Sequence, residues 1–158
     1  MKKYLIPFLA IVCIGYVSCS DDSIADLPDP AAREIWTGPT LTFEKAEEAS
    51  PTESSNQDRL TGNVWLTRGN SGGQIYNAKS ENTFDKENSP AGTQWAVGNI
   101  SDIDNLSFKK FREAIKPEEV VGKNLVLFLV EDNTFLSVKF TKWSKGKKGG
   151  FAYERSSQ

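Results

Sequence analysis

The most constraining feature of the sequence is an unbroken apolar run of six residues, from Leu125 to Val130. A polar Glu-Asp-Asn turn follows, and residues 134–144 then alternate between apolar and polar side chains. A lysine- and glycine-rich segment leads into a short aromatic run at 151–153. Three strands joined by two short turns predict an antiparallel meander. Because the first strand is apolar on both faces, we expect it to be covered above and below.

The upstream half of the chain predicts shorter strands separated by polar or glycine-rich loops. We expect these strands at residues 40–43, 63–68, 74–77 and 93–97. The segment from Lys45 to Asp58 is polar and contains Pro51, which is typical of a surface loop. Together with the meander, these strands predict an all-β domain over residues 35–158, a mostly antiparallel β-sandwich.

One α-helix is expected to cover the sheet, over residues 107–115. Ser107 is a good N-cap, and Phe108, Phe111 and Ile115 recur on one helical face. Leu106 precedes the cap, where it can pack against Phe111 as a hydrophobic staple. The expected fold is therefore all-β with one covering helix.

The N-terminus has the features of an export signal. Lys2 and Lys3 supply a short positive region, and residues 4–17 are apolar and uncharged. This apolar stretch is shorter than the ~20 residues of a membrane-spanning helix, but it is long enough for a signal peptide. We therefore predict that residues 1–18 are a signal peptide.

Cys19 follows a small residue at the expected cleavage point. Residues 16–19 (YVSC) resemble the lipobox of bacterial lipoproteins, although that family prefers leucine where Tyr16 stands. In that family the cysteine thiol is lipidated and its amine becomes the new N-terminus. The alternative is an ordinary secretory signal, which would leave Cys19 as a lone thiol in the exported chain. We expect lipidation at Cys19, which would attach the protein to the membrane.

Acidic residues after Cys19 favour display at the cell surface. Ser20-Asp21-Asp22 resembles the short acidic tag that directs lipoproteins to the surface in some Gram-negative lineages; the alternative is a solvated linker. Residues 19–34 are acidic, contain Pro28 and Pro30, and show no hydrophobic period, which predicts a tether. The expected location is the outer membrane, with lipid anchoring and surface exposure.

Composition excludes several functions. The net charge is −2, which argues against nucleic-acid binding, for which a basic patch would be expected. Residues 69–73 (GNSGG) resemble the nucleophile loop of trypsin-like proteases, but the chain has no histidine to act as the base, and nothing marks a lysine for that role. Without histidine or a free cysteine, zinc and copper sites are not expected.

Oxygen ligands leave calcium open as an alternative. Candidate clusters occur at 102–105 and 131–133, but neither has the glycine and distant glutamate of an EF-hand loop. Paired carboxylates for glycoside hydrolysis also stay open, with Glu154 in the most apolar setting. We assign no cofactor, no metal site and no catalytic residue.

Aromatic residues supply the candidate binding site. Flat aromatic faces near amides hold sugars in many β-sandwich modules, although buried tryptophan is commoner. Trp36, Trp65 and Trp95 are expected in the core. By strict alternation Trp143 falls on the polar face of its strand, and we predict binding roles for Trp143 and Tyr153. A bulge near Lys142 would instead turn Trp143 inward.

Four motifs occur in order in the domain: NVWLTRG at 63–69, SPAGTQWA at 89–96, VKFTKW at 138–143 and GGFAYERS at 149–156. They resemble an uncharacterised β domain that recurs in exported bacterial proteins, often beside cell-surface sorting segments. The resemblance covers about residues 36–157. It implies export and an all-β fold, and it transfers no activity and no site residues.

The sequence thus predicts a non-catalytic surface lipoprotein that recognises a glycan or another envelope component. A structural or accessory subunit of an envelope complex is the alternative, in which a protein partner buries the aromatic face. A carboxylate-based hydrolase is the third interpretation. Copurification of a partner would favour the accessory-subunit interpretation. Glycan binding by the isolated domain would favour the recognition module.

Overall fold

A computed structural model describes residues 27–158; the predicted signal peptide and the lipobox at Cys19 lie outside this range. The strands are β1 (Glu34–Ile35), β2 (Leu41–Lys45), β3 (Asp58–Arg59), β4 (Trp65–Arg68), β5 (Ile75–Asn77), β6 (Thr93–Val97), β7 (Asn124–Leu129), β8 (Thr134–Trp143) and β9 (Phe151–Arg155). The helical segments are η1 (Pro30–Ala32), η2 (Ser54–Asn56), η3 (Ile100–Asn105), α1 (Phe111–Ala114) and η4 (Pro117–Glu119).

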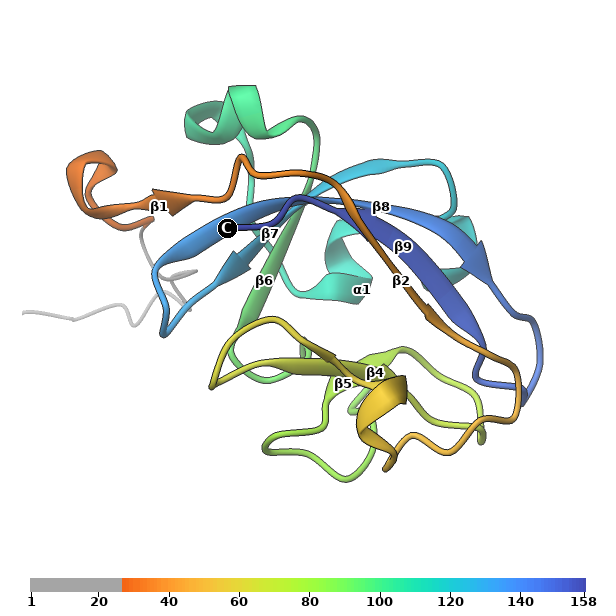
Figure 1. Cartoon of the computed structure of the whole chain (residues 1–158). Helices are drawn as coiled ribbons and strands as arrows, with labels where there is room; N and C mark the ends of the chain where they lie inside the picture. The colour runs from red at the N-terminus through yellow and green to blue at the C-terminus, as the bar shows by residue number, and fades with distance from the viewer. Residues whose placement is uncertain (1–26) are drawn as a thin grey trace, which may run out of the picture.

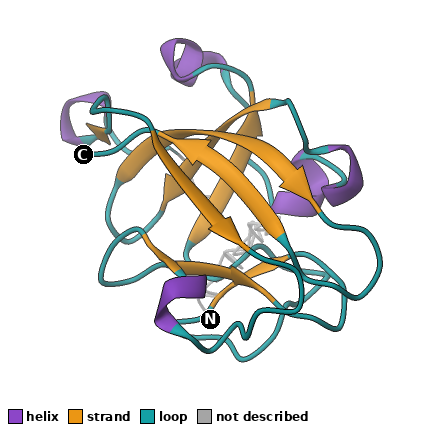
Figure 2. Cartoon of the chain, turned by 45° about the vertical axis from the view of Figure 1, so that its right-hand side comes forward, coloured by secondary structure: helices purple, strands orange, loops and turns teal. Residues whose placement is uncertain are grey.

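The strands form two sheets that face one another (Figures 1 and 2). The larger sheet has six strands in the order β2-β9-β8-β7-β6, with β1 paired in parallel to the start of β8. The smaller sheet has three strands in the order β3-β4-β5. Every other strand pairing is antiparallel. The prediction of an all-β, mostly antiparallel sandwich is confirmed.

Strands β7, β8 and β9 are the predicted meander and lie at the centre of the larger sheet. The turn between β7 and β8 places Asn133 at φ 53°, a left-handed conformation that asparagine tolerates better than most residues. Residues 125–129 are all buried, while Val130 at the turn is exposed. The apolar run therefore marks the most enclosed strand of the fold, as expected.

The two faces of β7 belong to different apolar clusters. Leu125, Leu127 and Leu129 pack toward the smaller sheet and α1, in a cluster that includes Trp95. Val126 and Phe128 point the other way and pack with residues of η3 and of segment 106–108. Phe128 stacks on Phe135 of β8, with ring centroids 4.3 Å apart and an interplanar angle of 9°. The larger sheet is thus covered on both faces along β7.

The predicted helix over 107–115 is wrong at its start. The helix α1 begins at Phe111, and Ser107 is not its N-cap. Lys109 instead pairs with Trp95 of the edge strand β6, and each backbone amide donates to the other's carbonyl at 2.8 Å. Phe108 consequently packs in the outer cluster while Phe111 packs in the inner one. The apparent helical face is therefore divided between the two sides of the sheet.

The expected hydrophobic staple is also absent from the described part of the chain: Leu106 packs with the outer cluster, away from Phe111.

The end of the expected tether lies on the domain. Leu27 packs against the outer cluster, and Arg33 forms an ion pair with Asp104 of η3. Among residues 27–158, no helix has the length and apolarity needed to cross a membrane.

Strand β7 gives the first test of this architecture. Leu127→Ala should lower the free energy of unfolding by ~2–5 kcal/mol, because it opens a cavity in the inner cluster. Lys139→Ala, on an exposed position of the neighbouring strand, should change it by less than ~0.5 kcal/mol. Urea denaturation of both variants measures the difference. Equal losses would contradict the assignment of faces.

Candidate functional site

The two predicted binding residues are not an aromatic platform. The register of β8 against β9 shifts between Phe140 and Lys142, which is the bulge that sequence analysis left as the alternative. The bulge turns Trp143 toward the core, where it packs edge-on against Phe140 at 5.6 Å and lies under the Arg68 guanidinium, 4.0 Å away. Trp143 is only partly exposed, and Tyr153 is completely buried. The bulge therefore corrects the strict alternation that placed Trp143 on the polar face, and Tyr153 is buried rather than exposed to a ligand.

Tyr153 instead takes part in a polar link between the two sheets. Its hydroxyl donates to Asp58 Oδ2 at 2.7 Å, and Arg155 donates to both oxygens of the same carboxylate, at 2.7 and 3.0 Å. Asp58 lies on β3 in the smaller sheet, whereas Tyr153 and Arg155 lie on β9 in the larger one. Burial, followed by the Asp58 charge, raises the pKa of Tyr153 well above its usual value. This cluster holds the sheets together.

A second polar link joins the two glycine-rich turns. Arg68 donates to carbonyls of both turns, Gly73 at 2.9 Å and Gly150 at 3.0 Å. Lys45 Nζ donates to Asn70 Oδ1 at 2.9 Å and to the Gly149 carbonyl at 3.3 Å. Both cations are buried, and burial lowers the pKa of Lys45 and that of Arg68, the latter to about 10.

Close approach of the two turns explains the glycine at position 149. Gly149 has φ 67°, and a Cβ there would lie 2.2 Å from Asn70 Oδ1 and 2.7 Å from the Gly69 carbonyl oxygen. Two similar hairpins, each with a strand, a glycine-rich turn and an aromatic strand, thus meet through their turns. The GNSGG segment at 69–73 is part of this contact and makes a structural turn.

The other tryptophans divide between core and surface. Trp36 and Trp95 are buried, as predicted. Trp65 is only half-buried on β4, so its assignment to the core is wrong. The Arg59 guanidinium lies 4.2 Å from the Trp65 ring, and Lys79 Nζ lies 4.8 Å from it.

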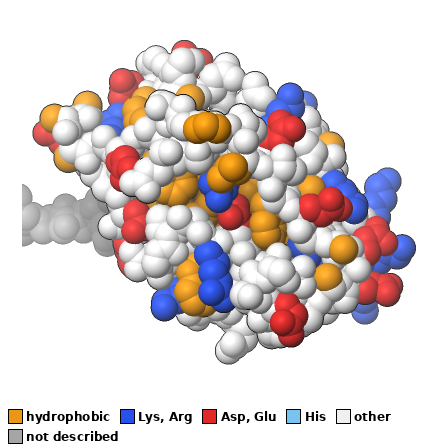
Figure 3. Space-filling view, in the orientation of Figure 1, with side chains coloured by type: hydrophobic (Ala, Val, Ile, Leu, Met, Phe, Trp, Pro, Cys, Tyr) orange, Lys and Arg blue, Asp and Glu red, His pale blue; other side chains and the backbone are white. Residues whose placement is uncertain are grey.

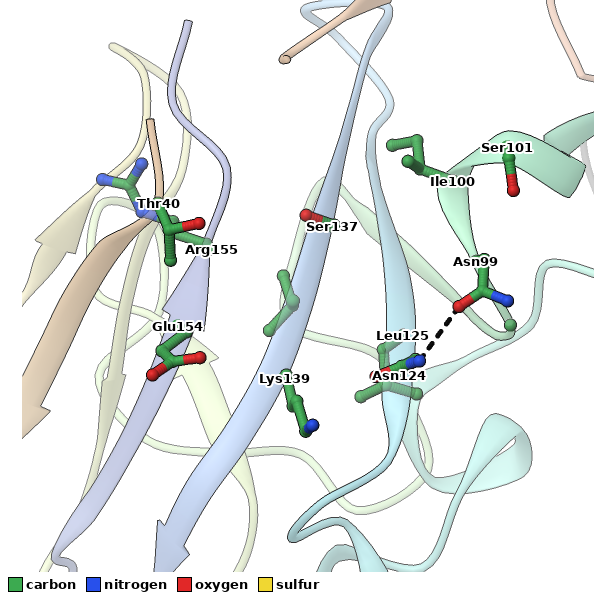
Figure 4. A pocket seen from close by; sticks show the side chains of 12 residues that line it. Thr40, Asn99, Ile100, Ser101, Asn124, Leu125, Ser137, Lys139, Glu154 and Arg155 are labelled. Carbon is green, nitrogen blue, oxygen red and sulfur yellow. Dashed lines mark hydrogen bonds between the residues drawn. The ribbon is translucent and has the colours of Figure 1, made fainter. Parts of the chain in front are cut away.

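An open cleft of about 320 Å³ lies on the outer face of the larger sheet and is here named the outer-face cleft (Figure 4). Its lining residues come from β7, β8, β9, the segment before β2, the link after β6 and the start of η3: Thr40, Gly98, Asn99, Ile100, Ser101, Asn124, Leu125, Ser137, Val138, Lys139, Glu154 and Arg155. Adjacent strands form its floor, and residues 99–101 form a wall beside β7.

A polar row crosses the floor of the outer-face cleft. Lys139 on β8 is in register with Asn124 of β7 on one side and with Glu154 of β9 on the other. Residues opposite one another in antiparallel strands have Cβ atoms ~4.5–5.5 Å apart. Ser137 precedes Lys139 by two positions and so belongs to the same face. The sheet register therefore brings together an amide, an ammonium, a carboxylate and a hydroxyl.

Most of these groups keep free hydrogen-bonding capacity. Asn124 Nδ2 donates to Asn99 Oδ1 at 2.9 Å, which fixes the wall to the floor (Figure 4). Within residues 27–158, neither Lys139 nor Glu154 forms an ion pair, and both side chains are exposed. The cleft thus offers strong donors and acceptors on rigid strands, with Ile100 as an apolar neighbour.

In each acidic cluster considered for calcium, one carboxylate is engaged elsewhere. Asp104 pairs with Arg33, and Asp132 accepts hydrogen bonds from Thr61 at 2.7 Å and from Asn63 at 2.9 Å. In the part of the chain that the structure describes, no three acidic, histidine or cysteine side chains are grouped to hold a metal ion. Among the described residues that line the outer-face cleft, Glu154 is the single acid.

Comparisons of the chain with protein-family models, with curated proteins and with solved structures gave no match. The fold and the site themselves define the class: an all-β, sandwich-like domain with an open polar cleft on the outer face of its larger sheet.

The link through Tyr153 gives a pH-dependent prediction. Because the pKa of Tyr153 is raised above the ~10 of an unfolded tyrosine, its contribution to stability is complete below pH ~10 and is lost as the pH rises further. Tyr153→Phe should therefore weaken the alkaline loss of stability. At pH 7 it should cost ~1–3 kcal/mol, since the buried Asp58 carboxylate loses a donor. Urea denaturation between pH 7 and 11 measures both; an unchanged pH slope would contradict the assignment.

Proposed function

We propose that this chain is an outer-membrane lipoprotein whose β-sandwich domain is a non-catalytic recognition module. The ligand is a glycan or another polar envelope component, and it binds in the outer-face cleft. The observation that carries this proposal is the row of exposed polar groups across the cleft floor, made of Asn124, Lys139 and Glu154, of which Lys139 and Glu154 form no ion pair among the described residues.

The size and chemistry of the cleft support a sugar-sized ligand. Its volume of about 320 Å³ is at the lower end of the range for small-ligand sites, ~300–1,000 Å³. A sugar presents many hydroxyl groups that both donate and accept hydrogen bonds, and the cleft offers both kinds of partner. Because the floor is made of paired strands, the backbone that carries these side chains is held in place before binding, which lowers the entropic cost of ordering it.

The same residues favour binding over hydrolysis. Both common mechanisms of glycoside hydrolysis require two carboxyl groups on either side of the scissile bond. Of the described residues that line the cleft, only Glu154 carries a carboxyl group, and its two neighbours in register are Lys139 and Thr42. The accessory-subunit alternative depended on an exposed aromatic face, and its main residues, Trp143 and Tyr153, are turned inward. In the view of Figure 3, apolar atoms form small separate patches among charged ones.

The expected anchor is compatible with the position of the cleft. Leu27 packs in the outer cluster together with Ile100, and Ile100 also lines the cleft wall. Eight residues beyond Cys19 bring the chain to Leu27, and a fully extended chain of that length spans at most ~29 Å. A lipid on Cys19 would therefore keep the cleft close to the membrane surface, where envelope glycans are concentrated.

Anchoring is tested by Cys19→Ala. This variant should lose its lipid and leave the membrane fraction, because it lacks the thiol that would carry the lipid. Cys13→Ala, which removes the other cysteine of the N-terminal region, should stay lipidated and membrane-bound. Fractionation with mass spectrometry of the N-terminal peptide measures both properties. Membrane retention of an unlipidated Cys19→Ala protein would refute the proposed anchor.

Ligand recognition is tested on a glycan array with the protein lacking its signal peptide. If a glycan binds in the outer-face cleft, the Lys139→Gln/Glu154→Gln double variant should bind it at least ~10-fold more weakly, equivalent to ~1.4 kcal/mol. The control Lys145→Gln/Glu118→Gln removes the same charges at exposed positions outside the cleft and should bind normally. A glycan bound equally well by both variants would show that the cleft is not the site.

A further inference from the structure

Lys45 is a buried lysine without an acidic partner. It ends β2, the edge strand of the larger sheet, and no part of it is exposed. None of the five ion pairs within residues 27–158 includes it. Its Nζ donates to Asn70 Oδ1 at 2.9 Å and to the Gly149 carbonyl at 3.3 Å. These two acceptors match the two N–H groups of a neutral amine, and the third N–H of an ammonium group has no acceptor in the described part of the chain.

The surroundings of Lys45 favour the neutral amine. Burial lowers the pKa of Lys45, and the positive charge of Arg68 lowers it further. Arg68 is itself buried and donates to the backbone carbonyls of Gly73, Ser144 and Gly150, so it brings no negative charge to the site. Burial and a neighbouring cation are the two conditions that make a lysine amine nucleophilic in proteins.

The side-chain amide of Asn70 lies within reach of this amine. Because a C=O bond is about 1.2 Å long, Nζ lies no more than ~4.1 Å from the Asn70 Cγ atom. Reacting atoms in a near-attack geometry are ~3–3.5 Å apart, so a small movement is sufficient. Asn70 Nδ2 donates to the Ala49 carbonyl at 3.0 Å, which holds the amide with its oxygen toward Nζ. Gly149 leaves room for this oxygen, since a Cβ at that position would overlap it.

We propose that Lys45 and Asn70 form an intramolecular isopeptide bond. Nζ attacks Cγ, the bond from Cγ to Nδ2 breaks, and one proton moves from Nζ to the leaving nitrogen. The products are a secondary amide and ammonia, and no oxidant or other reactant takes part. The positive charge of Arg68 favours the negative charge that develops on Asn70 Oδ1 during the attack. Asn70 is partly exposed, so ammonia can leave to solvent.

This bond joins the two sheets covalently. Lys45 ends β2 of the larger sheet, and Asn70 lies in the turn between β4 and β5 of the smaller one. Residues 27–158 contain no cysteine, so a disulfide cannot supply such a link there. A cross-link between distant residues stabilises a fold by restricting the unfolded chain. The bond also replaces a buried amine that would be costly to charge. It does not depend on ligand binding in the outer-face cleft.

Intact-mass spectrometry of the protein lacking its signal peptide tests the bond, directly after purification and again after prolonged incubation. We expect a mass below that of the sequence by one ammonia. A tryptic digest should then contain peptide 34–59, uncut after Lys45, joined to peptide 69–79. The joined peptide distinguishes the isopeptide bond from loss of ammonia at another asparagine.

Two variants and a control make the outcome specific. Lys45→Arg and Asn70→Ala should each keep the full mass of their sequence and melt at least ~5 °C below the wild-type protein. The control Lys145→Arg changes an exposed lysine of the neighbouring turn and should lose one ammonia as the wild-type protein does. The mass of the wild-type protein is decisive even if a variant fails to fold. The proposal is overturned if the wild-type protein keeps its full mass at both times, if Lys45→Arg still loses ammonia, or if the digest joins other residues.

Discussion

The whole domain depends on the burial of β7 on both of its faces. A strand whose residues 125–129 are all buried needs cover above and below, and the two apolar clusters supply it. In the inner cluster, the smaller sheet and α1 pack against β7. The outer cluster draws in η3, segment 106–108 and Leu27. Transfer of so many large side chains from water is the main favourable term, at roughly 1.5–3 kcal/mol for each buried side chain.

Polar links then fix how the two layers lie on each other. Apolar contacts are not directional, so they do not by themselves set the relative position of two sheets. Along β9, the hydrogen bonds of Tyr153 and Arg155 to the Asp58 carboxylate fix this position. At the glycine-rich turns, the hydrogen bonds of Arg68 and Lys45 fix it. Each buried polar group in these links would lose hydrogen bonds if the sheets moved. These links therefore fix the relative position of the two sheets, as a disulfide between sheets would.

Sequence patterns predicted the parts of the fold that depend on local periodicity. The meander, strand β6 and the all-β class follow from alternation and from the apolar run. The start of the covering helix could not be predicted in this way. The pairing of Lys109 with Trp95 is a contact between separate segments, and no local pattern reveals it. The positions of Trp143 and Tyr153 depended on a bulge in β8 and on a carboxylate from the other sheet. Strict alternation cannot include either effect.

The outer-face cleft exists because the outer cover of the sheet ends part of the way across it. The η3 segment and its neighbours cover Val126, Phe128 and Phe135, and beyond them the outer face of β8 carries Ser137 and Lys139. Alternation in the sequence predicts that these two residues point away from the core. It says nothing of the wall at 99–101, which lies far away in the chain and reaches β7 through the bond between Asn99 and Asn124. A polar face becomes a concave site only where such a wall lies beside it. The wall is placed there because η3 and its neighbours cover the outer face of β7.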